Sequence, residues 1–151
     1  MDKSVQRKLL GFFEQYPRKT YKSGVIFISP DKNNQEIFFL IKGAVRSYTL
    51  SRSGSELTIN IFRQYTFFPL ECAVNEIENR YYYEAISSDV TLYAAPQHDV
   101  LMFIEENQDI LVDLSRRILR GLPGYFRRVE SFLSGSAYFR VYACIVIFAR
   151  R

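Results

Sequence analysis

The sequence predicts a mainly β protein, an antiparallel sandwich or jelly roll with flanking helices. Between residues 20 and 95, short runs rich in β-branched and aromatic residues alternate with turn residues. The 151 residues include 13 Phe and 11 Tyr, which suits half-buried strands because flat rings pack well on a pleated surface. Before and after this region, apolar residues recur instead at helical spacing.

Residues 1–18 form the expected N-terminal helical segment. Within residues 3–15, apolar side chains recur near one helical stripe, at Val5, Leu9, Leu10, Phe12 and Phe13. Pro17 then stops the helix, because its ring cannot continue the backbone hydrogen bonding.

Residues 19–106 contain the predicted jelly roll. Its strand-like runs are residues 25–29, 36–42, 44–51, 56–62, 65–68, 81–87 and 90–95. Seven or more short strands, separated by turn segments such as SPDKNNQ and SRSGS, are typical of this architecture. Gly54 fits the positive-φ position of a tight hairpin, and Gly43 fits a bulge or turn. Pro96 opens a short helix, PQHDVLMFIEEN.

Residues 107–134 are predicted to form a long dimerisation helix. Its apolar residues recur every three or four positions and define a seam of heptad type, at Leu111, Leu114, Ile118, Leu122, Tyr125, Val129 and Phe132. The Gly121-Leu-Pro123-Gly124 stretch should kink this helix or break it into two, and it is a candidate hinge. Residues 135–151 are expected to begin a further helix.

Charge, cysteine content and histidine content exclude several classes of protein. The net charge of +4 arises in residues 109–151, where 8 Arg outnumber 3 acidic residues, and it fits a solvated helix face or nucleic-acid contact. Two distant cysteines and one histidine, His98, provide no disulfide framework, metal site or catalytic triad. With no signal peptide and no apolar run above nine residues, we expect a cytoplasmic protein that has neither enzymatic activity nor a membrane partner.

Three stretches in order carry a family resemblance: KSGVIFISPDKNNQEIFFLIKGAVRSYTLSRSGSELTINIF, YYYEAISSDVTLYAAP and RVYACIVIFARR. Together with the long helix, they resemble the sensor half of the CRP/FNR family of bacterial transcription regulators. The resemblance implies a double-stranded β-helix (jelly roll) of the cyclic-nucleotide-binding type, a small-molecule effector and a homodimer formed by the long helix. It also implies allosteric control of a C-terminal helix-turn-helix that binds DNA. Residues 135–151 resemble only the start of that domain, so DNA would be contacted through a part that this chain lacks.

In cyclic-nucleotide binders of this family, a cassette of the form F-G-E-L is followed by R-x-A. Glycine lets backbone N–H groups approach the cyclic phosphate, arginine neutralises it, and glutamate accepts a hydrogen bond from the ribose. Here Pro69 replaces the glycine and removes one N–H, while Glu71 sits one position late. If Ala85 matches the family's alanine, Asn79 falls on the arginine position and Tyr81 on the small residue. We therefore do not expect cyclic AMP to bind in the family's usual mode.

An aromatic-walled cavity with Arg80 and Glu71 at its mouth would instead suit a small organic anion or an aromatic acid. The alternative is that the rings complete the core and leave no cavity. The predicted ligand-binding residues are Phe68, Leu70, Glu71, Arg80, Tyr81, Tyr82, Tyr83, Tyr125 and Arg128. Cys72 is interpreted as a small buried hydrophobic residue rather than a haem or redox ligand.

We expect no cofactor besides a small organic effector. Two other functions stay open on the sequence alone. One is a jelly-roll dimerisation module that has lost ligand binding. The other is a cyclic-nucleotide-binding regulatory domain from a different class of protein, such as a kinase or channel.

Overall fold

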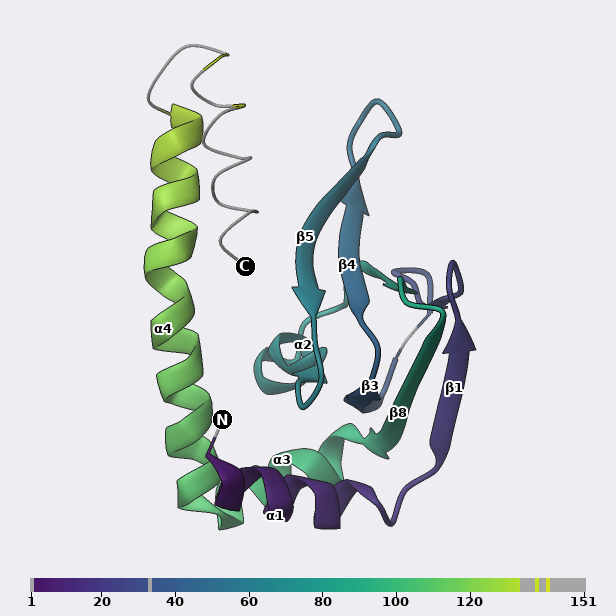
Figure 1. Ribbon diagram of the computed structural model, residues 1–151, viewed down its shortest axis with the longest axis vertical. Helices are drawn as coiled ribbons and strands as arrows, with labels where there is room; N and C mark the ends of the chain where they lie inside the picture. The colour runs from purple at the N-terminus through teal and green to yellow at the C-terminus, as the bar shows by residue number, and fades with distance from the viewer. Residues whose placement is uncertain (1, 33, 134–137, 139–140, 142–151) are drawn as a thin grey trace. The chain divides into compact units, whose positions relative to one another are not determined.

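The computed structural model describes residues 2–32, 34–133, 138 and 141. The chain divides into two compact units, residues 2–107 and the segment from Gln108 onward, and each is described by itself. Figure 1 shows the ribbon of both units.

The first unit is a jelly roll made of two antiparallel four-stranded sheets, as the sequence predicts. Its first sheet has the order β1-β8-β3-β6, and its second sheet has the order β2-β7-β4-β5. The strands are β1 (Arg18–Lys22), β2 (Ile26–Ile28), β3 (Glu36–Lys42), β4 (Val45–Leu50), β5 (Glu56–Phe62), β6 (Phe67–Phe68), β7 (Tyr82–Ala85) and β8 (Asp89–Pro96). The helices of this unit are α1 (Lys3–Phe13), α2 (Leu70–Asn75) and α3 (Gln97–Glu106).

Two elements of the jelly roll are absent from the sequence prediction. Strand β1 has the sequence RKTYK, whose charged residues conceal its pairing with β8 in the register Thr20↔Thr91. Charged side chains are common on edge strands because they discourage pairing with other chains. Helix α2 is only six residues long, too short to show an apolar period in the sequence.

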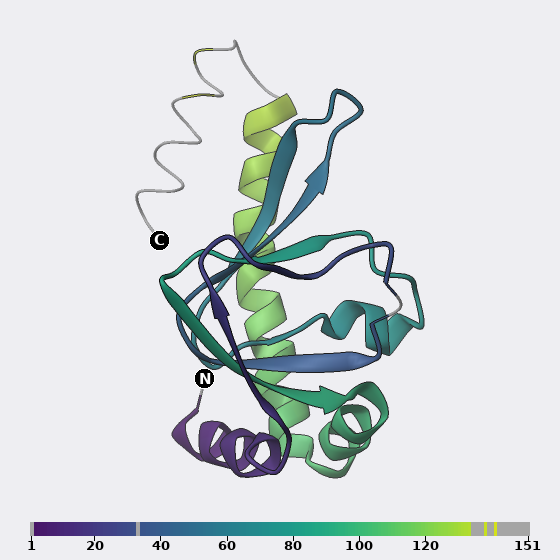
Figure 2. The same ribbon diagram turned by 90° about the vertical axis from the view of Figure 1, so that its right-hand side faces the viewer.

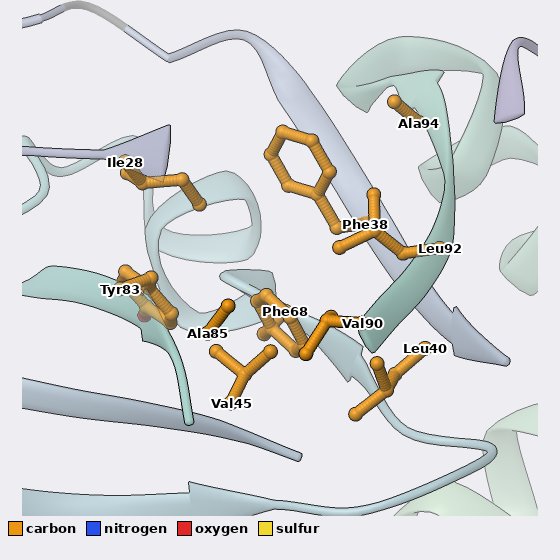
Figure 3. Packing of buried hydrophobic residues seen from close by; sticks show 10 residues of the cluster. All are labelled: Ile28, Phe38, Leu40, Val45, Phe68, Tyr83, Ala85, Val90, Leu92 and Ala94. Carbon is orange, nitrogen blue, oxygen red and sulfur yellow. The ribbon is translucent and has the colours of Figure 1, made fainter. Parts of the chain in front are cut away.

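The core has two layers, one on each face of the first sheet. Between the sheets lies a cluster of ten buried residues, which Figure 3 shows: Ile28, Phe38, Leu40, Val45, Phe68, Tyr83, Ala85, Val90, Leu92 and Ala94. On the opposite face, Phe13 of α1 stacks on Phe39 of β3 with ring centroids 4.8 Å apart. Helices α1 and α3 lie side by side at one end of the jelly roll (Figure 2), where Phe12 stacks on Phe103 at 4.0 Å.

Both glycines that the sequence singles out adopt positive φ. Gly54 has φ 81° in the β4–β5 hairpin, as predicted, and open space surrounds the position of a Cβ. Gly43 has φ 91°, and a Cβ there would lie 2.6 Å from the backbone oxygen of Asp89. The β3–β8 register shifts between Leu40 and Lys42, just before this glycine. The backbone at residue 43 therefore has room for glycine alone.

The second unit contains helix α4 (Gln108–Leu133), a continuous helix of 26 residues. The predicted break at Gly121–Gly124 is wrong, since Pro123 lies inside the helix. A proline there removes one backbone hydrogen bond, but the leucine and arginine residues on both sides are strong helix formers and keep the helical backbone. The predicted helix within residues 135–151 lies outside the described residues, as do the side chains of Arg128 and Phe132.

The seam of α4 is largely exposed in this chain. Its residues Leu111, Ile118, Leu122, Tyr125 and Val129 are 37–57% exposed. Leu114 is half-buried. A row of large apolar side chains at heptad spacing is the pattern that a partner helix buries.

Candidate effector-binding site

The segment at the cassette position turns from strand β6 into helix α2. The peptide bond between Phe68 and Pro69 is cis, and Pro69 occupies the N-cap of α2. Proline has no N–H, so this position offers no backbone donor to a phosphate. At the other end of α2, Glu76 adopts a left-handed conformation with φ 52° and turns the chain away. The cassette is therefore a short helix whose N-cap residue donates no backbone hydrogen bond.

Two of the predicted ligand-binding rings lie in the core between the sheets. Phe68 and Tyr83 are fully buried and stack with ring centroids 5.3 Å apart and an interplanar angle of 9°. Phe62 packs against both, with centroids 4.6 Å from Phe68 and 5.8 Å from Tyr83. Figure 3 shows Phe68 and Tyr83 among the aliphatic residues of the cluster. These rings complete the core, which was the alternative to an aromatic-walled cavity.

Glu71 is bound to this core by a hydrogen bond. The Tyr83 hydroxyl donates to Oε1 of Glu71 over 3.1 Å, while most of the glutamate remains exposed. Burial raises the pKa of Tyr83 far above its ordinary value, and the Glu71 carboxylate raises it further, so the phenol stays protonated. Glu71, which lies one position after the family's ribose-binding glutamate, thus accepts a hydrogen bond from the protein's own core.

Tyr82 lies on the opposite face of the second sheet, as alternation along a strand requires. Its ring stacks on Tyr48 with centroids 5.1 Å apart, and the Arg46 guanidinium lies 4.6 Å above the Tyr48 ring. Arg46 also forms salt bridges of 2.6 Å with Glu84 and Glu56. The hydrogen bond that Arg46 donates to the Glu84 carboxylate raises the pKa of Arg46 above its ordinary value. This network holds Tyr82 on the outer face of the sheet.

The other predicted contacts are partly accessible. Arg80 is exposed, Leu70 is half-buried, and Tyr81 packs at the edge of the core cluster. Tyr125 belongs to α4, in the second unit, and is 44% exposed. The role of these residues in ligand binding stays a prediction.

The structure contains a polar pocket of about 460 Å³ on the jelly roll, which the sequence does not reveal. We call it the α2 pocket. Its walls come from the β2–β3 loop, from α2 with the segment after it, and from the first residue of α3. They comprise Pro30, Asp31, Lys32, Asn34, Gln35, Cys72, Glu76, Ile77, Glu78, Asn79 and Gln97. None of the predicted ligand-binding residues is among them.

Cys72 is buried, as the sequence interpretation expects, and it is 7% exposed at the α2 pocket. Burial raises the pKa of the Cys72 thiol, and the neighbouring Glu71 carboxylate raises it further. The thiol is therefore protonated near neutral pH and is a poor nucleophile.

Neither a metal cluster nor a membrane span is found in the part of the chain that the structure describes. No group of three or more His, Cys, Asp or Glu side chains there converges on a point where a metal ion would fit. No helix there has both the length and the hydropathy needed to cross a membrane.

Comparison with known proteins adds a family and a fold to this geometry. Residues 18–107 match the family model of the cyclic nucleotide-binding domain. The Global nitrogen regulator of Nostoc sp. is 26% identical over 121 residues, which cover 80% of this chain and 52% of the relative. The chain thus spans about half the length of the curated relatives it matches, which are named as regulators rather than enzymes.

Solved structures share the fold at low sequence identity. The Thermus thermophilus Catabolite Activator Protein aligns with a TM-score of 0.67 at 18% identity, covering 82% of this chain and 58% of that one. Oxidized CprK in complex with o-chlorophenolacetic acid aligns with a TM-score of 0.63 at 14% identity, covering 81% of this chain and 49% of that one. Both alignments confirm the predicted jelly roll followed by a long helix. The chain belongs to the cyclic nucleotide-binding domain family and is a regulatory domain of the CRP/FNR type.

Proposed function

We propose that this chain is the sensing and dimerisation part of a CRP/FNR-type transcription regulator. In this proposal, a small organic effector bound by the jelly roll controls DNA binding by a C-terminal helix-turn-helix domain outside this chain. The observation that carries the proposal is the exposed seam of α4 that follows the jelly roll. The names of the matched relatives support a regulatory role, since both are global nitrogen regulators, and the matched part of this chain covers about half of each relative.

The seam favours a second copy of this chain as the partner of α4. Ile118 and Val129 are 57% and 53% exposed, although both are apolar. Burying apolar surface contributes roughly 25 cal/mol per Å², so pairing two identical seams gives a favourable association free energy. Self-pairing of a single helix face also satisfies the two-fold symmetry of most homodimers.

The effector that fits this domain best is a small aromatic acid rather than cyclic AMP. Pro69 provides no donor to a cyclic phosphate, and Glu71 is already engaged by Tyr83. The exposed guanidinium of Arg80 would pair with a carboxylate, and the neighbouring Tyr81 would contact a ring. The complex of CprK with o-chlorophenolacetic acid supports this class, because that ligand is an aromatic acid bound by a protein of the same fold.

A second function is favoured by the packing of Phe68 on Tyr83 in the core. If the rings leave no space for any effector, the chain is a dimerisation module that has lost ligand binding. The two functions share the dimer and differ only in the response to small molecules.

The dimer is tested by placing one charge on the seam. Ile118→Glu should weaken dimerisation by about 100-fold, because a buried carboxylate without a partner is costly in an apolar interface. The matched control is Arg120→Glu, which puts the same side chain on the opposite side of the helix and should leave dimerisation unchanged. Analytical ultracentrifugation over a range of concentrations measures both. A wild-type chain that stays monomeric, or an Ile118→Glu chain that dimerises normally, contradicts the proposal.

The effector is tested by thermal unfolding with o-chlorophenolacetic acid, benzoic acid, cyclic AMP and cyclic GMP. A bound acid at about 100 times its Kd stabilises the folded state by about 2.7 kcal/mol, so it raises Tm. This shift should disappear in Arg80→Ala and persist in Arg52→Ala, which removes an arginine from the exposed β4–β5 turn. A shift with cyclic AMP that depends on Arg80 would restore the family's usual mode. No shift with any of the four compounds would favour the module without a ligand.

A further inference from the structure

The α2 pocket is separate from the residues expected to contact the effector, and its floor is polar. Cys72 is buried there, while Asn34, Asn79 and Gln97 are half-buried. A volume of about 460 Å³ lies within the range of pockets that hold small molecules. The pocket is therefore large enough for a metabolite and is not lined by an apolar surface.

The floor of the α2 pocket offers hydrogen-bond acceptors. The side-chain amide of Asn34 donates to the backbone oxygen of Glu36 over 2.6 Å, and that of Gln97 donates to the backbone oxygen of Asn34 over 3.0 Å. Each amide thus donates one hydrogen bond within the protein. Their side-chain oxygens accept no hydrogen bond from any residue that the structure describes.

The rim of the α2 pocket is acidic. Asp31, Glu76 and Glu78 line it together with one cation, Lys32, which gives the rim a formal charge of −2. Among the described residues, no salt bridge engages any of the three carboxylates. These charges attract a cation, and the oxygens of the floor require hydrogen-bond donors.

A metal ion does not meet this description, because the acidic side chains of the described residues do not converge as a set of three or more ligands. Spaced acceptors suit a molecule that carries several N–H donors along its length. We propose that the α2 pocket binds a small organic cation with ammonium or guanidinium groups, such as a diamine. Its charged ends contact Glu76 and Glu78, and one N–H group reaches the oxygens of Asn34 and Gln97.

Such a cation would connect three segments that are distant in the sequence. It would join the segment after α2 to the β2–β3 loop and to Gln97, whose backbone N–H already donates to Gln35 over 2.9 Å. The other end of α2 carries Glu71, which accepts from the core residue Tyr83. Occupancy of the pocket therefore stabilises α2 against local unfolding.

Cys72 provides a direct probe of occupancy. In a Cys144→Ser chain, Cys72 is the remaining cysteine, and its alkylation by iodoacetamide reports access to the floor. Putrescine at about twice its Kd leaves about a third of the pockets empty, so the rate of Cys72 alkylation should fall about threefold. The Glu76→Gln/Glu78→Gln variant should need about tenfold more putrescine for the same protection of Cys72, because the rim loses its net charge.

Three controls make the result decisive. Glu14→Gln removes an exposed carboxylate outside the pocket and should leave the protection unchanged. Sodium chloride at matched ionic strength and glutarate, an anion of similar length to putrescine, should not protect Cys72. Circular dichroism verifies that each variant is folded. No protection by putrescine, equal protection by glutarate or salt, or protection that survives in the double variant overturns the proposal.

Discussion

The jelly roll and helix α4 place their large apolar side chains in opposite environments. In the jelly roll, Phe39, Phe68 and Tyr83 are fully buried by neighbours in the same unit. In α4, Ile118 and Phe126 are 57% and 60% exposed. The first unit thus buries its large apolar side chains among its own residues, whereas the second exposes apolar area that the proposed dimer would bury. Substitutions in the two regions should consequently appear in different measurements, unfolding for one and assembly for the other.

The largest effect that this comparison predicts is in the core of the jelly roll. Phe68→Ala should lower the free energy of unfolding by about 3–5 kcal/mol, because it removes a buried ring and leaves a cavity between Phe62 and Tyr83. Phe126→Ala makes the same chemical change on α4 and should cost less than about 1 kcal/mol. Urea denaturation followed by circular dichroism measures both. Similar losses for the two variants would remove the distinction between the units.

A change in the opposite direction is expected at Pro123. Pro123→Ala should stabilise α4 locally by about 2 kcal/mol, because alanine restores a backbone hydrogen bond inside the helix. Hydrogen exchange of the α4 amides should then slow by about thirtyfold, while the amides of the jelly roll keep their rates. Exchange that stays unchanged in α4 would mean that the proline does not limit the stability of this helix.

The same variant examines the hinge hypothesis in a longer chain that includes the DNA-binding part. If Pro123 acts as a hinge, Pro123→Ala should alter the effector response of DNA binding. An unaltered response rules out the hinge and leaves Pro123 as an ordinary local weakness of the helix.

The smallest predicted effect is at the hydrogen bond that joins α2 to the core. Tyr83→Phe should cost about 1 kcal/mol, because it removes one hydroxyl that donates to Glu71 and leaves the stacked ring in place. In a Glu71→Ala background the same substitution should cost less, and a double-mutant cycle of thermal unfolding gives the coupling. Additive losses would show that this hydrogen bond contributes nothing to stability.

Local patterns were enough to predict most of the strands. The bounds of β3 (Glu36–Lys42) and β5 (Glu56–Phe62) follow from apolar or alternating runs that end in turn residues. Strand β1 has mostly charged and polar residues, so its strand character appears only when β8 provides its pairing partner. The predicted helix break at Pro123 was wrong because the low helix propensity of one residue is outweighed by the rest of the helix.

The candidate site was harder to predict than the fold. Alternation along β7 places Tyr82 and Tyr83 on opposite faces of the sheet, but it does not say whether the inward ring leaves space for a ligand. The stacking of Phe68 on Tyr83 depends on how far apart the two sheets lie, which no local pattern specifies. Likewise, the α2 pocket combines residues 30–32, 34–35, 72, 76–79 and 97, which only the tertiary fold brings together.

The position of β8 in the first sheet constrains how this chain folds during synthesis. Strand β8 pairs with β1 on one side and with β3 on the other, yet it is the last strand of the jelly roll to be made. While the ribosome is still translating residues before Asp89, β1 has no partner, and the backbone edge of β3 that β8 later covers is open. Exposed strand edges promote aggregation, so the nascent chain is most vulnerable in this interval. Completion of residue 96 thus sets the earliest moment at which the first sheet can close.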